Sequence, residues 1–274
     1  MYAACSKTLT FSNQAKIFII EGYAKWMTYK AIILAAGRGK RLRGLTDNIP
    51  KPFVEVAEKP IILRALDNLS EFSSCVDEVV IVIGYRGEIF VERIGNSYRN
   101  LKIVYVENPV WYRTNNIYSL WVARKHMDRD VLLIEGDIVF RREVIDRLLQ
   151  ITYRDVVVVG EYEKELQGAC VTLKGGVVEK FILSSEQGAD FDKRGKFITA
   201  NIYKLSKNFI RSHFMPEMER LIETGGENLF YEVAIKRLIE RGQVNLHALV
   251  EDNRVWVEID TISDLKRAER MVKW

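Results

Sequence analysis

A short apolar run that ends abruptly in a glycine-rich, cationic loop constrains the fold most. Residues 31–35 read Ala-Ile-Ile-Leu-Ala, which is too short for a globular helix and typical of a buried strand. Gly37 and Gly39 follow at once, and four cations crowd the same turn: Arg38, Lys40, Arg41 and Arg43. Glycine lets a ligand approach the main chain, and backbone amides with fixed positive charge attract an anion. The pattern predicts a phosphate-binding loop at the end of a buried strand.

Strand-like and helix-like segments alternate through the first half of the chain. Apolar runs that read as strands recur at 78–84, 101–107 and 131–135. Patterns typical of helices lie at 60–69, 87–95, 115–127 and 142–151. Alternation of this kind predicts an α/β fold with a Rossmann-like, mainly parallel sheet and helices on both of its faces.

The second half of the chain has a different texture. Strand-like segments separated by glycine turns follow one another at 156–160, 170–173, 176–183 and 197–206. Helices are then predicted at 209–224 and 229–241, a strand at 255–259, and a closing helix at 263–272 with Ser263 as its N-cap. We therefore expect small antiparallel additions, which make the sheet mixed.

Residues 28–274 contain no linker rich in proline, glycine or serine, so we treat them as a single domain. Residues 1–27 lack the long apolar core and the small-residue cleavage site of a secretory signal. We interpret them as a dispensable N-terminal extension. A chain that starts at Met27 should keep the circular dichroism spectrum and the turnover of the longer chain, and loss of either would contradict this interpretation.

Composition excludes several classes of protein. The net charge is +4 and both signs are spread along the chain, so no nucleic-acid partner is expected. No run of 18 apolar residues occurs, so no membrane insertion is expected. Cys5, Cys75 and Cys170 are far apart and form no C-x-x-C pair, which disfavours a zinc site or a disulfide framework. These features indicate a cytoplasmic location.

Two aspartates lie where a divalent cation would be bound. Asp137 follows a predicted buried strand, at the carboxyl end where open α/β sheets place their ligands. Asp260 ends the predicted strand near the C-terminus, and Glu258 alternates with it on the same face as a fallback ligand. Magnesium takes oxygen ligands, and usually only one or two protein carboxylates. Each aspartate could instead simply cap a turn or a helix.

The glycine-rich loop and its continuation resemble the LxxGxGxRL…PKP motif of the nucleotidyltransferase family that includes the nucleotide-sugar pyrophosphorylases. The matching residues are Leu34, Gly37, Gly39, Arg41, Leu42, Pro50, Lys51 and Pro52, although Gly44 stands where many relatives have proline. The family's strand-GD element resembles residues 133–137, and its W-x-(E/D)-I-D-T element resembles residues 256–261. Three elements in this order cover almost the whole domain.

The resemblance implies a nucleotidyltransferase (GT-A-like) fold, Mg²⁺ as cofactor, and roles for individual residues. Arg41 and the loop amides would hold a triphosphate, Lys51 would neutralise the α-phosphate, and Asp137 and Asp260 would bind the metal; these four are the expected catalytic residues. The nucleotide-binding set it implies is Leu34, Ala35, Ala36, Gly37, Arg38, Gly39, Lys40, Arg41, Lys51, Gly84, Tyr85, Asn115, Asn116 and Ser119.

The NN-x-YSL element at 115–120 resembles the CTP-using branch of the family, which includes inositol-1-phosphate and LicC-like phosphocholine cytidylyltransferases. The partners implied are CTP and a small phosphorylated alcohol, and the enzyme class is a cytidylyltransferase. Glu179-Lys180 resembles an acceptor element of the family, with Phe181 in place of the usual proline. The acceptor-binding residues we expect are Lys180, Asn201, Tyr203 and Glu232.

The acceptor itself stays open between inositol 1-phosphate, phosphocholine and a sugar 1-phosphate. The many Glu, Lys and Arg residues lean toward a thermophile, where inositol phosphates belong, and this favours inositol 1-phosphate. A choline group would need an aromatic cage, for which the chain offers Trp111, Tyr112, Trp121, Tyr162, Phe181 and Tyr203. Other classes also stay open: a non-catalytic nucleotide-binding regulatory subunit, or a glycosyltransferase, although Glu135-Gly136-Asp137 is not a D-x-D element. The oligomeric state is not predicted.

Overall fold

The structure is a computed structural model that describes residues 19–20, 23–24, 28–42, 44–163 and 166–273. Most of the expected N-terminal extension lies outside the described residues, so its dispensability stays a prediction. Within it, β1 (Ile19–Ile20) and β2 (Tyr23–Ala24) pair with each other in antiparallel orientation. Among the described helices, none has both the length and the apolar character that crossing a bilayer requires.

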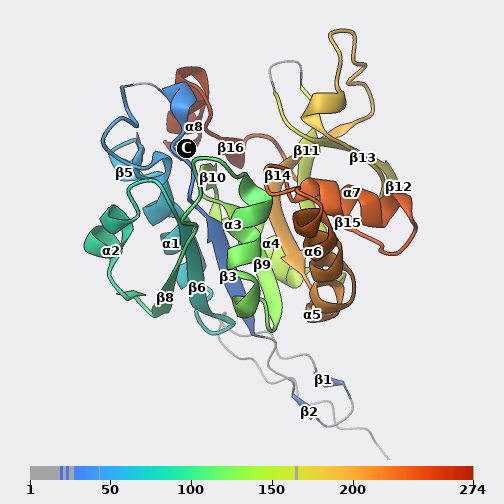
Figure 1. The fold of residues 1–274 in the computed structure, drawn as a ribbon, viewed down its shortest axis with the longest axis horizontal. Helices are drawn as coiled ribbons and strands as arrows, with labels where there is room; N and C mark the ends of the chain where they lie inside the picture. Colours follow the sequence, from blue (N-terminus) through green and yellow to red (C-terminus); the bar gives the residue numbers. More distant parts are fainter. Residues whose placement is uncertain (1–18, 21–22, 25–27, 43, 164–165, 274) are drawn as a thin grey trace, which may run out of the picture.

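A mixed sheet of ten strands forms the centre of the described part of the chain (Figure 1). Four adjacent strands run parallel, in the order β9 (Asp130–Glu135), β3 (Tyr29–Leu34), β6 (Val76–Ile83) and β8 (Leu101–Glu107). The short β7 (Ser97–Tyr98) pairs antiparallel at the edge. Every residue of β3 is buried, which explains why its sequence is apolar from Ala31 to Leu34. Lys30, its one charged residue, forms ion pairs with Glu78 and Asp128.

The second half of the chain extends this sheet with mostly antiparallel strands. β14 (Phe197–Leu205) pairs antiparallel with β9, and β12 (Cys170–Lys174), β13 (Val177–Ile182), β15 (His247–Val250) and β11 (Val156–Glu161) complete it. The mixed sheet is confirmed, but its antiparallel part is larger than the small additions we expected. The tight turn at Gly175 and Gly176 joins β12 and β13, so these two strands pair as an antiparallel hairpin.

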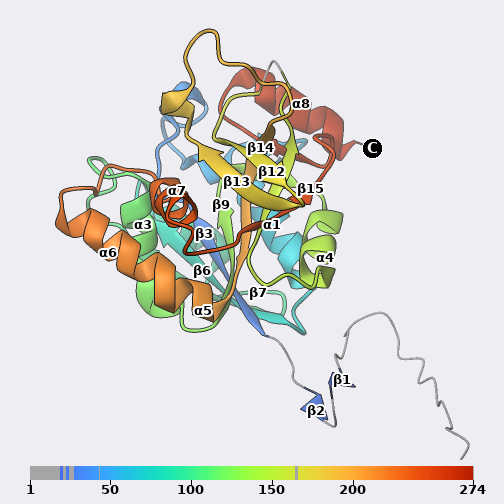
Figure 2. The same cartoon turned by 90° about the vertical axis from the view of Figure 1, so that its right-hand side faces the viewer.

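Helices cover both faces of the sheet, as predicted (Figures 1 and 2). On one face, α1 (Ile61–Ser70), α2 (Glu88–Ile94) and α4 (Arg142–Gln150) pack on the side chains of Ala31 and Ile33. On the opposite face, Ile32 of β3 belongs to a second apolar cluster, which includes side chains of α3 (Asn116–Val122), α5 (Lys207–Phe209), α6 (Met215–Glu223) and α7 (Glu232–Glu240).

Several predicted helix boundaries are wrong in detail. The helix expected at 115–127 ends at Val122 and is followed by a 3₁₀ turn at Arg124–His126. The segment expected at 209–224 starts as α5 and passes through a π-helical turn, Ile210–Phe214, into α6. The helix expected at 229–241 starts at Glu232. The last helix, α8 (Ile262–Val272), is capped by Thr261 rather than Ser263, because the Thr261 hydroxyl accepts from the Asp264 amide at 3.3 Å.

A small separate sheet joins two segments that are distant in the sequence. β16 (Trp256–Glu258), which lies within the strand expected at 255–259, pairs with β10 (Ile138–Phe140) and not with a strand of the main sheet. The Ile259 amide also donates to the Asp137 carbonyl at 3.0 Å. With α8 and the hairpin of β4 (Glu55–Val56) and β5 (Lys59–Pro60), this pair encloses its own apolar cluster. The pairing brings the segments that carry Asp137 and Asp260 together.

Candidate functional site

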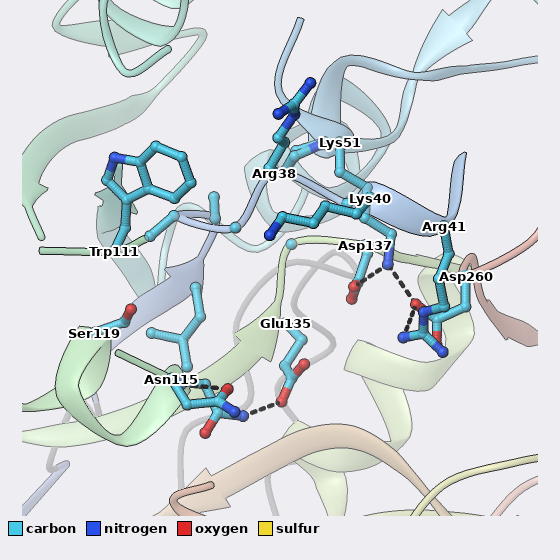
Figure 3. Close-up of a pocket in the computed structure, with 18 of the residues that line it drawn as sticks. Arg38, Lys40, Arg41, Lys51, Trp111, Asn115, Ser119, Glu135, Asp137 and Asp260 are labelled. Carbon is cyan, nitrogen blue, oxygen red and sulfur yellow. Dashed lines mark hydrogen bonds and ion pairs between the residues drawn. The ribbon is translucent and has the colours of Figure 1, made fainter. Parts of the chain in front are cut away.

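A cavity of about 670 Å³ opens where the carboxyl ends of β3 and β9 meet the loops that follow β8 and β16 (Figure 3). Its lining combines the glycine-rich loop, four carboxylates and three aromatic rings. The lining residues are Leu34, Ala35, Ala36, Gly37, Arg38, Gly39, Lys40, Arg41, Lys51, Pro52, Trp111, Tyr112, Thr114, Asn115, Asn116, Ser119, Glu135, Gly136, Asp137, Phe230, Glu258 and Asp260.

The glycine-rich loop folds into a 3₁₀ turn, Lys40–Leu42, as soon as it leaves β3. Gly39 has a φ of +71°, and a Cβ at this position would lie 2.8 Å from the Cβ of Lys51. Glycine therefore serves both the backbone conformation and the close packing of Lys51 beneath the loop. Figure 3 shows the Lys40 side chain extending over the cavity. The loop thus presents amides and cations to one space.

Lys51 joins the two aspartates that the sequence singled out. Its Nζ donates to Oδ2 of Asp137 at 2.6 Å and to Oδ1 of Asp260 at 2.7 Å. The side chain is only 9 % exposed. Burial alone would lower the pKa of Lys51, but the two carboxylates outweigh it and raise this pKa above its ordinary value. The ammonium is therefore held charged between the two acids.

Arg41 completes this charged group from the loop. Its Nη2 lies 2.7 Å from the same Oδ1 atom of Asp260 that Lys51 contacts, and its side chain stays 65 % exposed. The structure thus brings together all four expected catalytic residues, Arg41, Lys51, Asp137 and Asp260. Two cations and two carboxylates alternate along one wall of the cavity.

The carboxylates next to this group fit a divalent cation. Oxygen atoms of Glu135, Asp137 and Glu258 lie within 4.8 Å of one another. Oδ1 of Asp137 is buried and has no hydrogen-bond partner among the described residues. Carboxylate oxygens are the donors that Mg²⁺ prefers. Asp260, which we expected as the second ligand, is held by Lys51 and Arg41 in this structure, so Glu258 and Glu135 stand beside it as candidate ligands.

Gly136 sets how closely the carboxylate strand approaches the loop strand. A Cβ here would lie 2.8 Å from the Leu34 carbonyl oxygen and 3.1 Å from the Ala35 Cβ, and the Gly136 amide donates to that same carbonyl at 2.8 Å. Real Cβ atoms do not approach a backbone oxygen this closely, so a side chain must push the two strand ends apart.

We therefore expect Gly136→Ala to lower the free energy of unfolding by about 1–3 kcal/mol through overpacking. It should also raise the KM for the nucleotide, because Asp137 moves with the strand. Chemical denaturation and steady-state kinetics measure the two effects. Gly188, where a Cβ would contact nothing within 4 Å, provides the matched control.

A second hydrogen-bond network, which joins the carboxyl groups of Glu135 and Glu232 through Asn116, lies at the inner end of the cavity. The Asn116 amide donates to Oε1 of Glu135 at 3.1 Å and to Oε2 of Glu232 at 3.5 Å. Its carbonyl oxygen accepts from the Tyr231 amide at 2.9 Å, which fixes which way the side chain points. Asn116 lines the cavity as expected, but its hydrogen bonds hold two acids in place.

Burial dominates the protonation of these acids. Burial and then the neighbouring Glu232 raise the pKa of Glu135 well above its ordinary value. Burial likewise raises the pKa of Glu232 to about 7. Glu258 shows the same direction, because burial and the nearby Asp137 and Asp260 outweigh the attraction of Lys51. The inner end is therefore an acidic environment that favours a proton or a cation.

Asn115 and Ser119 form part of the floor of the cavity. Asn115 caps α3, because its side-chain oxygen accepts from the backbone N–H of Asn116 at 2.8 Å. The backbone N–H of Asn115 donates to the Glu227 carbonyl at 3.0 Å. The buried Asn108 donates to the Ser119 hydroxyl at 3.1 Å. Asn115 therefore both caps a helix and lines the cavity.

Gly84 and Tyr85, expected among the nucleotide-binding residues, do not line the cavity. They support its wall from behind: the Tyr85 amide donates to the Ala36 carbonyl at 3.0 Å, and the Tyr85 ring packs edge-on against Trp111 at 5.3 Å. The Arg38 guanidinium lies over the outer face of the Tyr85 ring, 5.4 Å from its centroid. The turn after β6 therefore positions the loop and Trp111.

The expected acceptor residues are not brought together at the cavity surface. Lys180 is exposed on β13 and is absent from the lining. Tyr203 is fully buried in the core, where its ring packs edge-on against Tyr231 at 5.8 Å. Asn201 lies behind Glu258, to which its amide donates at 3.5 Å, and Glu232 lies behind Asn116. Asn201, with a φ of +52°, lies at a bulge of β14, and a bulge interrupts the alternation of side chains between the two faces of a strand.

Three aromatic side chains border the cavity from two loops. Trp111 and Tyr112 lie between β8 and α3, and Phe230 precedes α7. Tyr112 is 68 % exposed and Phe230 is 47 % exposed, which is unusual for large rings. The sequence offered Trp111 and Tyr112 only as two of several candidate rings, and gave no signal for Phe230 beyond its position before Glu232.

Comparison with known proteins agrees with this geometry. Residues 31–250 match the model of the MobA-like NTP transferase domain. The chain is 33 % identical, over 88 % of its length, to the CMP-5'-(3-aminopropyl)phosphonate synthase of Streptomyces rubellomurinus, of which it covers 38 %. It is 31 % identical, over 58 % of its length, to the UTP–glucose-1-phosphate uridylyltransferase AglF of Haloferax volcanii, of which it covers 66 %. The chain thus spans less than two thirds of these curated relatives.

Two solved structures share the fold. The CTP:phosphocholine cytidylyltransferase LicC of Streptococcus pneumoniae superposes with a TM-score of 0.71 at 22 % identity, over 90 % of this chain and 100 % of that chain. The inositol-1-phosphate CTP transferase of T. maritima does so with a TM-score of 0.67 at 22 % identity, over 90 % and 96 %. The match to the domain model covers most of the chain, and the chain therefore belongs to the MobA-like NTP transferase family of nucleotidyltransferases.

Proposed function

We propose that the chain is a Mg²⁺-dependent cytidylyltransferase that transfers CMP from CTP to a small phosphorylated alcohol and releases pyrophosphate. One observation carries the proposal: Lys51 bridges Asp137 and Asp260 at 2.6 and 2.7 Å beneath the loop that holds Arg41. These residues are far apart in the sequence, with Arg41 and Lys51 near its start, Asp137 at its middle and Asp260 near its end, and all of them line one cavity. The cavity of about 670 Å³ has the size typical of small-molecule sites.

The phosphates of the nucleotide would lie against the glycine-rich loop. Its amides and the cations Arg38, Lys40 and Arg41 offset negative charge there. Lys51 lies between this loop and the carboxylates, within reach of a phosphate held by the loop. Lysine suits the position because its ammonium is a mobile point charge that can follow charge as it develops.

The transfer itself needs little proton chemistry. An oxygen of the acceptor phosphate attacks the α-phosphorus of CTP, the bond from the α-phosphorus to the bridging oxygen breaks, and pyrophosphate leaves. A phosphate monoester is already ionised near neutral pH, so no base must remove a proton from it. Catalysis then rests on alignment and charge neutralisation by Arg41 and Lys51.

Magnesium fits the acidic side of the same site. Asp137 would hold it, together with Glu258, Glu135 or Asp260. When bound, the ion offsets the charge on the phosphate oxygens of the triphosphate.

Inositol 1-phosphate is the acceptor that we propose first. A polyol needs several hydrogen-bonding groups, and the inner end of the cavity offers Glu135, Asn116, Ser119 and Thr114. The likeness in fold to an inositol-1-phosphate CTP transferase supports this choice. So does the element at 115–120, which resembles that of the CTP-using branch of the family. A sugar 1-phosphate would find the same groups, and AglF keeps that alternative open.

An acceptor with a cationic amine, such as phosphocholine, is the second candidate. Three carboxyl groups of the site form no ion pair with a lysine or arginine of the described residues: Glu135, Glu232 and Glu258. Lys51 attracts Glu258 only over a longer distance. The exposed rings of Tyr112 and Phe230 stand at the rim, and aromatic faces attract ammonium groups. Two proteins similar to this chain are named for compounds that carry an amino or a quaternary ammonium group.

A pyrophosphate-release assay tests these proposals. Each of the four NTPs is combined with inositol 1-phosphate, phosphocholine, 3-aminopropylphosphonate and glucose 1-phosphate, with and without Mg²⁺. We expect CTP to be preferred by about tenfold or more in kcat/KM and chelation of Mg²⁺ to abolish turnover. Fastest turnover of UTP with glucose 1-phosphate would replace the proposal with a sugar-1-phosphate nucleotidyltransferase. Binding of CTP without turnover of any pair would indicate a regulatory subunit.

A further inference from the structure

A second strongly cationic feature lies on the outer surface, where α6 and α7 pack side by side (Figure 1). Arg220 from α6, with Arg237 and Arg241 from α7 and its C-terminal end, converge on the carboxylate of Glu217. We call these four residues the arginine cluster. None of them lines the cavity described above.

The carboxylate at the centre of the cluster is buried, whereas the cations around it are not. Glu217 is 2 % exposed, and its side chain lies between the two helices. Oε2 accepts from Arg220 and from Nη1 of Arg241, the latter at 2.7 Å, and Oε1 lies 3.6 Å from Nη1 of Arg237. The side chains of the three arginines stay 43–57 % exposed. Each therefore keeps N–H donors that face solvent.

The charges of the cluster do not balance. Three guanidinium groups share one carboxylate, and Glu217 is their only ion-pair partner in the described part of the chain. The C-terminus of α7 contributes about half a negative charge, which favours Arg241 and Arg237 but leaves more than one positive charge uncompensated. Guanidinium groups held this close repel one another, so an anion that contacts two of them relieves the repulsion.

We propose that the arginine cluster binds a small phosphate-bearing anion at a site separate from the nucleotide cavity. The planar guanidinium fork matches phosphate oxygens in pairs, and three forks from two helices can hold one phosphate group from several sides. Glu217 already holds one Nη1 atom of each guanidinium group, so little side-chain freedom is lost on binding. Free phosphate, pyrophosphate and the nucleotide itself share this chemistry.

The test is calorimetric titration of the full chain with inorganic phosphate, pyrophosphate or CTP, without Mg²⁺ and at constant ionic strength. Arg237→Gln is the informative variant, because its contact to Glu217 is the longest and the other two arginines still satisfy the buried acid. Arg270→Gln, which removes an exposed cation from α8, is the matched control. Arg237→Gln should weaken one binding event about fivefold or more, and Arg270→Gln should leave it unchanged.

A residue-resolved measurement accompanies the titration. The anion that binds most tightly should protect Arg220, Arg237 and Arg241 from modification by an arginine-specific dicarbonyl reagent, as read by mass spectrometry of the native chain. Unchanged affinity in Arg237→Gln, or equal modification of the three arginines with and without the anion, would overturn the proposal. The dissociation constants of phosphate, pyrophosphate and CTP then show which of these anions the site prefers.

Discussion

Replacing Asp137 by asparagine is expected to lower kcat for pyrophosphate release by about 10²- to 10³-fold, the effect of removing a preorganised charge from the reacting centre. The carboxylate contacts Lys51 at 2.6 Å, and its other oxygen is buried with no partner among the described residues. Asparagine keeps the shape of the side chain but cannot offer two anionic oxygens. Steady-state kinetics with CTP and the preferred acceptor, over a range of Mg²⁺ concentrations, measures the effect.

The fold should survive this change, because Lys51 keeps its contact with Asp260 at 2.7 Å. Circular dichroism and thermal unfolding of the variant check this. Asp190→Asn, which alters an exposed carboxylate on the loop between β13 and β14, is the matched control and should leave kcat unchanged. Turnover of Asp137→Asn within a factor of about two of the parent chain would remove this residue from the site and with it the proposed mechanism.

The first half of the fold could be predicted from the sequence because its strands are buried on both faces. The continuous apolar run of β3 has one interpretation, and its neighbours β6 and β9 repeat the pattern. β10 and β15 were missed, since three or four residues are too few to show a period. Tertiary contacts determine which strands β10 and β15 pair with, and they place β16 beside β10, outside the main sheet.

The charged group could be predicted because Arg41, Asp137 and Asp260 each follow a strand end or a glycine turn and Lys51 lies in a Pro-Lys-Pro element. Arg41, Lys51, Asp137 and Asp260 fall within motifs whose spacing is visible in the sequence. The acceptor residues could not be placed in the same way. Asn201 and Tyr203 were expected to bind the acceptor, but Asn201 lies at a bulge of β14 and Tyr203 is buried in the core. The surroundings of Glu232 depend on how the loop before α7 docks on Asn115 and Asn116.

Lys51→Gln should affect stability as well as turnover, because the ammonium is the cation that two carboxylates share. Without it, Asp137 keeps no ion-pair partner among the described residues, and Asp260 keeps Arg41 alone. The carboxylates are 19–20 % exposed, so water offsets part of the loss. We expect the free energy of unfolding to fall by about 2 kcal/mol and Tm by about 4–8 °C, with kcat lower by about 10²-fold or more.

Added Mg²⁺ should separate the role of Lys51 from a general loss of packing. In the variant, the two carboxylates face each other without the ammonium that bridged them, and a divalent ion can take its place, so Mg²⁺ should raise Tm more for Lys51→Gln than for the parent chain. Lys174→Gln, at an exposed position on β12, should respond to Mg²⁺ as the parent does. An equal response of Lys51→Gln and the parent would mean that Asp137 and Asp260 do not share a cation site. Because Lys51 and Asp137 are in contact, the double variant should lose less stability than the sum of the two single changes.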